Sequence, residues 1–152
     1  MAKYKQRISD RILKRKVLGK GAVLIEGPKW CGKTTTAKQL AKSVLGLGDS
    51  SVLRQSVQLI ELSPKTLLEG KTPRLIDEWQ ALPPIWDSIR SEVDKRGEPS
   101  QFILTGSSVL PEADETIHSG TGRYAYIKMR PMSLYESGES NGKVSLADLF
   151  DG

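Results

Sequence analysis

The sequence offers almost no sulfur or imidazole chemistry. Among its 152 residues it has one cysteine, Cys31, and one histidine, His118. A lone cysteine cannot close a disulfide within the chain, which fits a reducing compartment, and a lone histidine gives no sign of a zinc or haem site. No Ser/His/Asp arrangement is visible either. The search for chemistry therefore turns to glycine, lysine and the carboxylates.

Long apolar runs are also missing. No stretch approaches the roughly 18 apolar residues that a membrane span requires, and the basic N-terminus is not followed by the apolar core of a signal peptide. With 38% apolar and 27% charged residues, the composition is typical of a soluble globular domain with one core. We expect a cytoplasmic protein without a membrane partner.

Positive charge is concentrated at the N-terminus. The net charge is +5, and residues 1–20 contain eight Lys or Arg against one acid, Asp10. Apolar residues recur there at helical spacing, so we expect a basic helix over about 6–16 with its charges on a solvated face. Binding of nucleic acid or of an acidic partner is the alternative. The chain thus divides into the basic N-terminal helix, 1–20, and a core, 21–152.

A glycine-rich stretch at 27–34 is the most informative part of the sequence. It reads Gly-Pro-Lys-Trp-Cys-Gly-Lys-Thr and fits the pattern G-x-x-x-x-G-K-[ST] at every fixed position. It follows the apolar run 22–25 and precedes a helix-forming segment, which is the strand–loop–helix context of a phosphate-binding P-loop. A glycine-rich turn before an ordinary helix is the alternative, which the flanking elements disfavour. The stretch predicts a nucleotide site.

The residue types in this loop explain how it would hold a nucleotide. Gly27 and Gly32 permit a tight loop whose N–H groups point at an anion, and the amino end of the next helix adds to the positive field. Lys33 would reach the β- and γ-phosphates, and the Thr34 hydroxyl would ligate Mg²⁺. The predicted nucleotide-binding residues are Gly27, Pro28, Lys29, Trp30, Cys31, Gly32, Lys33, Thr34, Thr35 and Ser107.

Two carboxylates follow a short apolar stretch further along the chain. Leu-Ile-Asp-Glu at 75–78 matches the Walker B pattern, in which an aspartate holds Mg²⁺ and a glutamate accepts a proton from the attacking water. We assign these roles to Asp77 and Glu78, with Thr34 as the second metal ligand. Solvated acids at a strand end are the alternative. Pro73-Arg74 stands where further apolar residues are common, which leaves the length of this strand open.

Strand and helix patterns alternate along the rest of the chain. This alternation predicts an α/β fold, a three-layer αβα P-loop NTPase with a mainly parallel five-stranded sheet and the ligand at the carboxyl ends of the strands. The expected strands are 22–26, 43–47, 75–78, 102–104 and 124–129. The expected helices after the loop are 33–42, 52–62, 64–69 and 83–96, with two more beginning after Ser133 and Ser145.

Polar residues at two later positions complete the candidate site. Thr105, Ser107 and Ser108 close the fourth strand, where one of them could sense the γ-phosphate; an ordinary Ser/Thr turn is an equal alternative. Arg123 follows a glycine-containing loop, from which a guanidinium could stabilise transition-state charge in its own chain or in a neighbouring subunit. A surface arginine is the alternative. The predicted catalytic residues are Glu78, Lys33 and Arg123.

Four motifs, in this order, resemble those of a known family. They are AVLIEGPKWCGKTTTA at 22–37, PRLIDEWQ at 73–80, FILTGSS at 102–108, and Gly-Arg followed by MRPMSLYE within 122–136. Together they resemble the N-terminal ATPase domain of prokaryotic predicted ATPases of the AAA+ superfamily, in which a longer C-terminal region of uncertain function follows. The resemblance also implies that the present sequence ends before that region.

The same resemblance implies roles for individual residues. It implies binding of ATP and Mg²⁺ by Lys33, Thr34 and Asp77, with Glu78 as the catalytic glutamate. It also supports a sensor near Ser107 and a role for Arg123.

Three functions remain open at this point. The leading hypothesis is Mg²⁺-dependent ATP hydrolysis that drives or gates a C-terminal domain outside this sequence, with self-association supplying Arg123 in trans. A nucleotide-gated module that binds nucleic acid or protein, with little hydrolysis, is the first alternative, and the basic N-terminus motivates it. A P-loop kinase for a small acceptor ranks lowest, because Asp77 and Glu78 resemble a water-activating pair.

Overall fold

A five-stranded parallel sheet forms the centre of the molecule. The structure is a computed structural model, and it describes residues 3–107 and 122–150. Every strand pair in the sheet is parallel, and the strand order is β2-β3-β4-β1-β5. The strands are β1 (Ala22–Glu26), β2 (Ser43–Gly46), β3 (Arg74–Asp77), β4 (Phe102–Gly106) and β5 (Tyr124–Lys128). The predicted fold class is confirmed.

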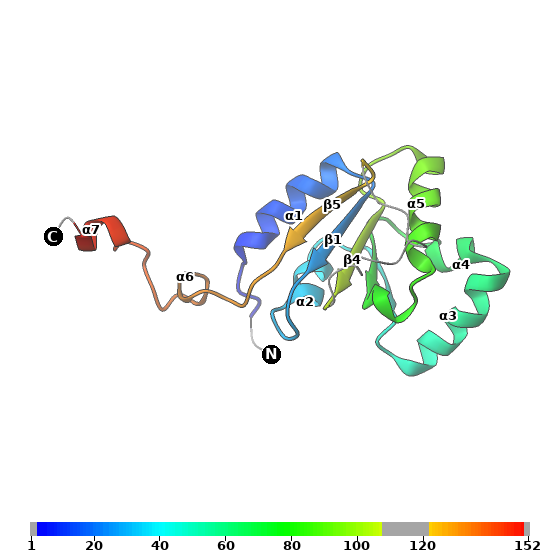
Figure 1. The fold of residues 1–152 in the computed structure, drawn as a ribbon, viewed down its shortest axis with the longest axis horizontal. Helices are drawn as coiled ribbons and strands as arrows, with labels where there is room; N and C mark the ends of the chain where they lie inside the picture. The colour runs from blue at the N-terminus through cyan, green and yellow to red at the C-terminus, as the bar shows by residue number, and fades with distance from the viewer. Residues whose placement is uncertain (1–2, 108–121, 151–152) are drawn as a thin grey trace.

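Helices cover both faces of this sheet (Figure 1). They are α1 (Ile8–Gly19), α2 (Lys33–Lys38), α3 (Ser50–Leu62), α4 (Pro64–Leu68), α5 (Ile85–Arg96), α6 (Leu134–Ser137) and α7 (Leu146–Phe150), with a 3-10 turn, η1 (Trp79–Ala81). Successive residues of a strand point to opposite faces, so β1 contributes to two separate cores. Val23 and Ile25 pack with α1 and α2, whereas Ala22 and Leu24 pack with α3, α4 and α5. The result is three layers, αβα.

Two elements differ in length from the sequence-based expectation. Helix α2 ends at Lys38 instead of continuing to 42. The Lys42 N–H donates to Pro73 O at 2.8 Å, and Ser43 pairs with Arg74, so the chain leaves the helix early to enter the sheet. Helix α1 conversely runs on to Gly19, because Val17 still packs into the core.

Strand β3 begins at Arg74, which settles the length that the sequence left open. Its guanidinium is half-buried and reaches polar partners at the sheet edge, donating to Leu67 O at 3.1 Å and to the Ser43 hydroxyl at 3.0 Å. A charged residue can therefore occupy the first position of this strand because its charged end is solvated by protein oxygens.

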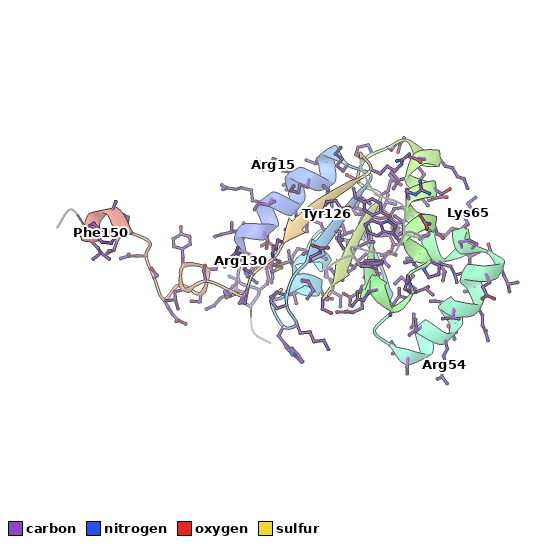
Figure 2. All side chains as sticks on the ribbon, viewed as in Figure 1. Arg15, Arg54, Lys65, Tyr126, Arg130 and Phe150 are labelled. Atoms are coloured by element: carbon purple, nitrogen blue, oxygen red, sulfur yellow. The ribbon has the colours of Figure 1, made fainter. Side chains whose placement is uncertain are left out.

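The last described residues lead away from the sheet. After β5 the chain passes through α6 to α7, where Phe150 lies far from the αβα body (Figures 1 and 2). Among the described helices, none is long and apolar enough to cross a membrane.

Candidate functional site

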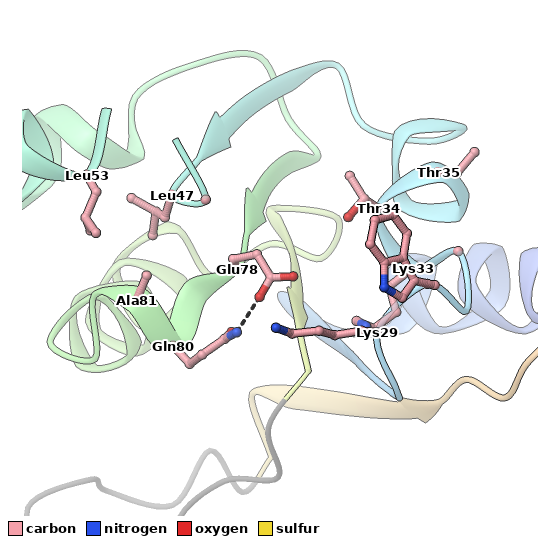
Figure 3. A pocket seen from close by; sticks show the side chains of 12 residues that line it. Lys29, Lys33, Thr34, Thr35, Leu47, Leu53, Glu78, Gln80 and Ala81 are labelled. Atoms are coloured by element: carbon pink, nitrogen blue, oxygen red, sulfur yellow. Dashed lines mark hydrogen bonds between the residues drawn. The ribbon is translucent and has the colours of Figure 1, made fainter. Parts of the chain in front are cut away.

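The carboxyl ends of the strands surround a cavity of about 740 Å³. The P-loop, residues 27–34, forms one wall as it leaves β1 and enters α2. The opposite wall comes from residues that follow β2 and β3, and Figure 3 shows Lys29 of the P-loop extending toward Glu78 and Gln80 on that wall. Its lining residues are Lys29, Trp30, Gly32, Lys33, Thr34 and Thr35 on one side and Leu47, Gly48, Leu53, Glu78, Gln80 and Ala81 on the other. The cavity lies where parallel α/β sheets bind ligands.

Two glycines give the P-loop its shape. A Cβ on Gly27 would lie 2.3 Å from Met129 O, so no larger residue fits against β5 at this position. Gly32 has φ +97°, in the left-handed region that favours glycine. Lys33, directly after Gly32, folds back over the loop, and its Nζ donates to Gly27 O and Pro28 O at 2.9 Å each. The loop thus holds a buried ammonium group among its own carbonyls, available to an anion that enters the cavity.

The remaining loop residues occupy different environments. Cys31 is buried, with its thiol 3.8 Å from Met129 O, and packs in the core beside α1 and α2. Trp30 is 99% exposed, and its φ of 68° lies in the left-handed region, which is unusual for an aromatic residue. Lys29 and Thr35 are exposed at the cavity wall. All of these residues belong to the predicted nucleotide-binding set, and Cys31 is the one directed away from the cavity.

Thr34 and Asp77 are in direct contact. The Thr34 hydroxyl donates to Asp77 Oδ1 at 2.6 Å, and the Thr105 hydroxyl donates to the same oxygen. Strand β4 lies between β1 and β3 in the sheet, and Thr105 is opposite Asp77 in the strand register. This explains why a threonine from β4 joins a loop residue and a carboxylate that are far apart in sequence.

Glu78 directs its carboxylate into the cavity (Figure 3). Its φ of 58° and ψ of 49° turn the chain sharply at the end of β3, and its backbone N–H donates to the Thr105 hydroxyl at 3.4 Å. Gln80 Nε2 donates to Glu78 Oε2 and lies 3.4 Å from the Ser107 hydroxyl. Left-handed backbone at a non-glycine residue costs free energy and is concentrated at functional sites.

The three candidates for a phosphate sensor separate in the structure. Thr105 is fully buried and bonded to Asp77, whereas Ser107 is half-buried beside Gln80. Ser108 lies outside the described residues. Neither described hydroxyl lines the large cavity, so both would act from behind Asp77 or Gln80.

Arg123 does not reach this site within its own chain. It precedes β5, and its carbonyl accepts from the Ala22 N–H at the start of β1, whereas the P-loop follows the end of β1. Five residues of strand separate the two edges by about 15 Å. Its guanidinium is paired with Asp94 at 2.6 Å. This position gives no support to a contribution of Arg123 in its own chain, and its catalytic role stays a prediction.

Sequence reasoning missed two contributors to the site. Gln80 orients Glu78, and the signal was its position two residues after the acid, within one 3-10 turn. Arg7, in the N-terminal segment, contacts the P-loop through the Cys31 carbonyl, and no local sequence pattern predicts this contact. Trp79, which stands between Glu78 and Gln80, is buried and packs on Trp86, with 5.0 Å between ring centroids.

A metal ion at this site would rely on few protein ligands. Within residues 3–107 and 122–150, no three His, Cys, Asp or Glu side chains gather into a cluster. Thr34 and Asp77 offer a hydroxyl and a carboxylate, and Mg²⁺ prefers such oxygen ligands and takes most of its shell from phosphates and water. The donor set therefore fits Mg²⁺ bound together with a nucleotide.

The sheet is parallel with the strand order β2-β3-β4-β1-β5, and a glycine-rich loop connects its first strand, β1, to the following helix. These features define a P-loop nucleotide-binding domain. A family model described as an AAA domain matches residues 19–138, and the chain belongs to this family. The predicted resemblance to AAA+ ATPases is confirmed, and membership of the family indicates nucleotide binding.

Two mycobacterial proteins and one solved structure are similar to this chain. The uncharacterized proteins Rv2008c of Mycobacterium tuberculosis and Mb2031c of Mycobacterium bovis are each 27% identical to this chain over 120 residues. The match spans 78% of this chain and 27% of theirs. The structure of PCH-2 from Caenorhabditis elegans aligns with a TM-score of 0.41 at 15% identity, covering 83% of this chain and 44% of that one.

Proposed function

We propose that this domain binds ATP together with Mg²⁺ and hydrolyses it. The observation that carries the proposal is the contact between Thr34 and Asp77, at 2.6 Å, beside a cavity that also receives Lys33 and Glu78. A hydroxyl, a carboxylate, a lysine and a second carboxylate are the groups that P-loop hydrolases use. Family membership supports the nucleotide, and the donor set supports the metal.

Each residue has a separate role in this proposal. Lys33 leaves the loop carbonyls and binds the β- and γ-phosphates, whose charge the loop N–H groups also offset. Thr34 and Asp77 hold Mg²⁺, which neutralises phosphate charge when bound. Glu78 accepts a proton from the attacking water.

Gln80 is the residue that orients this base. Its amide donates to one carboxylate oxygen of Glu78, which leaves the other oxygen to receive the proton. The left-handed backbone at Glu78 fixes the position from which the carboxylate enters the cavity. Two constraints on one side chain are what a positioned general base requires.

The experiment compares phosphate release and ATP affinity in wild type and Glu78→Gln. We expect the variant to bind Mg²⁺-ATP within about twofold of wild type while turnover falls by about 100-fold or more, since the amide cannot take the proton. Glu61→Gln, an exposed acid on α3, is the matched control and should change neither. Equal turnover in wild type and Glu78→Gln would remove Glu78 from the mechanism.

A role for Arg123 requires self-association. Its position at the far edge of the sheet, about 15 Å from the P-loop, supports delivery only into a neighbouring copy. Turnover per molecule should then rise with protein concentration, and Arg123→Ala should remove the rise. Turnover that stays constant over a 100-fold range of concentration would count against a trans arginine.

A nucleotide-gated binding module is the second candidate. The observation in its favour is the outer face of α1, where Arg11, Lys14 and Arg15 are exposed (Figure 2 labels Arg15). Such a face attracts phosphate backbones in a salt-dependent way. Titration of a labelled oligonucleotide at two salt concentrations, with and without ATP, tests it. Absent or salt-insensitive binding would count against nucleic acid as the partner.

A further inference from the structure

The N-terminal segment before α1 lies against the outer side of the P-loop. The Tyr4 hydroxyl donates to Asp10 Oδ1 at 2.6 Å and lies 3.1 Å from the Thr36 hydroxyl on α2. Burial and the hydrogen bond to Asp10 raise the pKa of Tyr4 to about 12. A charged segment is thereby fixed beside the loop that follows β1, although it belongs to neither the sheet nor the cavity.

Arg7 carries the main contact between this segment and the loop. Its guanidinium donates to Cys31 O at 2.7 Å and to Arg130 O at 2.9 Å, and its Nε donates to Glu136 at 3.1 Å. The Arg7 side chain is 6% exposed. One planar group therefore joins the P-loop, the exit of β5 and helix α6, using donors in three directions.

Glu136 is held as firmly as Arg7. Besides the guanidinium, its carboxylate accepts from the backbone N–H groups of Ile8 and Ser133 at 2.8 Å each, and from the Ser133 hydroxyl at 3.0 Å. Burial alone would raise the pKa of Glu136. The two N–H groups, Arg7 and the Ser133 hydroxyl outweigh it and lower the pKa to about 2. The carboxylate is therefore charged wherever the pair is intact near neutral pH.

We propose that Arg7 is a positioning residue for the P-loop, and that the Arg7–Glu136 pair couples the conformation of that loop to helix α6. The proposal rests on the proposed function, because the loop matters only if it binds phosphate. Arg7 does not itself line the cavity and acts through the Cys31 carbonyl.

The geometry explains how Arg7 would fix the loop. A Cβ on Gly32 would lie 3.1 Å from Arg7 Nη1, so the guanidinium packs against the bend that precedes Lys33. The Cys31 carbonyl accepts from Arg7, and Cys31 does not line the cavity, so Arg7 fixes the bend from the side that the nucleotide would leave free. Without Arg7, a buried carbonyl and a buried carboxylate would both lose a charged donor, and the bend would relax.

Coupling follows from the same contacts. If phosphate binding favours one conformation of the bend, it also favours the arrangement of Arg7 that pairs with Glu136. Because coupling between two sites is reciprocal, an ordered α6 then favours phosphate binding. Figure 1 shows that α6 is the element through which the chain leaves the αβα body. The pair thus connects the nucleotide site to the segment that any C-terminal continuation would follow.

Cys31 provides a probe that is independent of nucleotide. It is the only cysteine, its side chain is buried, and its carbonyl is the acceptor for Arg7. The rate at which a thiol reagent modifies it reports opening of the loop. The variants are Arg7→Gln, Arg7→Lys and Glu136→Gln, with Lys65→Gln as the control for loss of an exposed positive charge, on α4.

We expect Arg7→Gln to raise the thiol rate and the dissociation constant for ATP by about tenfold each, and Glu136→Gln to raise both by about threefold. Arg7→Lys should not rescue, because one ammonium cannot serve three separate acceptors. Lys65→Gln should match wild type. ATP should slow amide exchange at 133–138 in wild type and fail to do so in Arg7→Gln.

The outcomes separate this proposal from the proposed function. Wild-type thiol rates and ATP affinity in folded Arg7→Gln would overturn the positioning role, and Glu136→Gln decides the question if Arg7→Gln does not fold. Rescue by Arg7→Lys would overturn the geometric argument. If wild type binds no ATP while Arg7→Gln still exposes Cys31, the proposed function fails and the hold of Arg7 on the loop stands.

Discussion

The Thr34 hydroxyl and Asp77 Oδ1 are 2.6 Å apart, although 43 positions of sequence separate the two residues. The contact spans a strand, because β4 lies between β1 and β3 and supplies Thr105 to the same carboxylate oxygen. Asp77 is thus fixed by two hydroxyls before any ligand enters. A carboxylate that is already oriented loses less conformational entropy when it binds a ligand.

Replacing Asp77 should remove the metal dependence of nucleotide binding. Asp77→Asn keeps the shape and can still bond to Thr34, but it lacks the charge that attracts a divalent cation. We expect Mg²⁺ to strengthen ATP binding in wild type and to have less than about a threefold effect in the variant. Calorimetric titration of ATP with Mg²⁺ and with EDTA measures this, and an undiminished Mg²⁺ effect in Asp77→Asn would exclude Asp77 as a ligand.

Thr105 and Ser107 should differ in which property they control. Thr105 is buried and bonded to Asp77, so Thr105→Val should lower both turnover and stability, the latter by about 1–3 kcal/mol. Among the residues that the structure describes, Ser107 hydrogen-bonds to Gln80 alone, at 3.4 Å. Ser107→Ala should change stability by less than about 0.5 kcal/mol while lowering turnover if it senses phosphate.

Denaturant unfolding and phosphate release on the same samples make this comparison. Full turnover in Ser107→Ala would remove Ser107 as the sensor, and unchanged stability in Thr105→Val would show that its hydroxyl is dispensable to the carboxylate.

The sequence predicted the local parts of this site and missed the parts that depend on distant contacts. The P-loop and the Asp77-Glu78 pair were predictable because each motif consists of residues that are adjacent in the sequence. Whether Thr105 or Ser107 faces Asp77 depends on the register of β3 and β4, which composition does not encode.

Longer-range contacts were beyond sequence reasoning for the same physical reason. Arg7 meets Glu136 across 129 positions, and no pattern in either segment requires that meeting. For Arg123, the position in the fold follows from the topology of the sheet. In a parallel sheet, a residue that precedes one strand lies at the amino edge of the sheet. Residues that follow the adjacent strands lie at the opposite, carboxyl edge.

Gly27 should tolerate no side chain. The Cβ of Gly27→Ala would lie 2.3 Å from Met129 O, a backbone atom of the segment after β5 that cannot rotate away. The loop must shift, so we expect ATP affinity to fall by at least about tenfold and stability by about 1–3 kcal/mol. Gly19→Ala is the control, since nothing lies within 4 Å of the Cβ it would add. Wild-type affinity in Gly27→Ala would mean that the loop adopts another path beside β5.

Acid should abolish the contribution of Glu136 to stability. A carboxyl group whose pKa is lower in the folded chain than in the unfolded chain stabilises the fold above its unfolded pKa, and the effect is lost as the pH falls through the folded pKa. For Glu136 these limits are 4.5 and about 2, because the N–H groups of Ser133 and Ile8, with Arg7, outweigh the opposing effect of burial.

The measurement is the melting temperature of wild type and of Glu136→Gln between pH 7 and pH 2. Wild type should melt higher from pH 7 down to about 5, and the two curves should converge as the pH falls toward 2. Glu61→Gln, which replaces an exposed acid, should follow wild type throughout. A difference between wild type and Glu136→Gln that stays constant down to pH 2 would mean that the carboxylate charge contributes nothing to the pair, and that Arg7 is held by neutral hydrogen bonds alone.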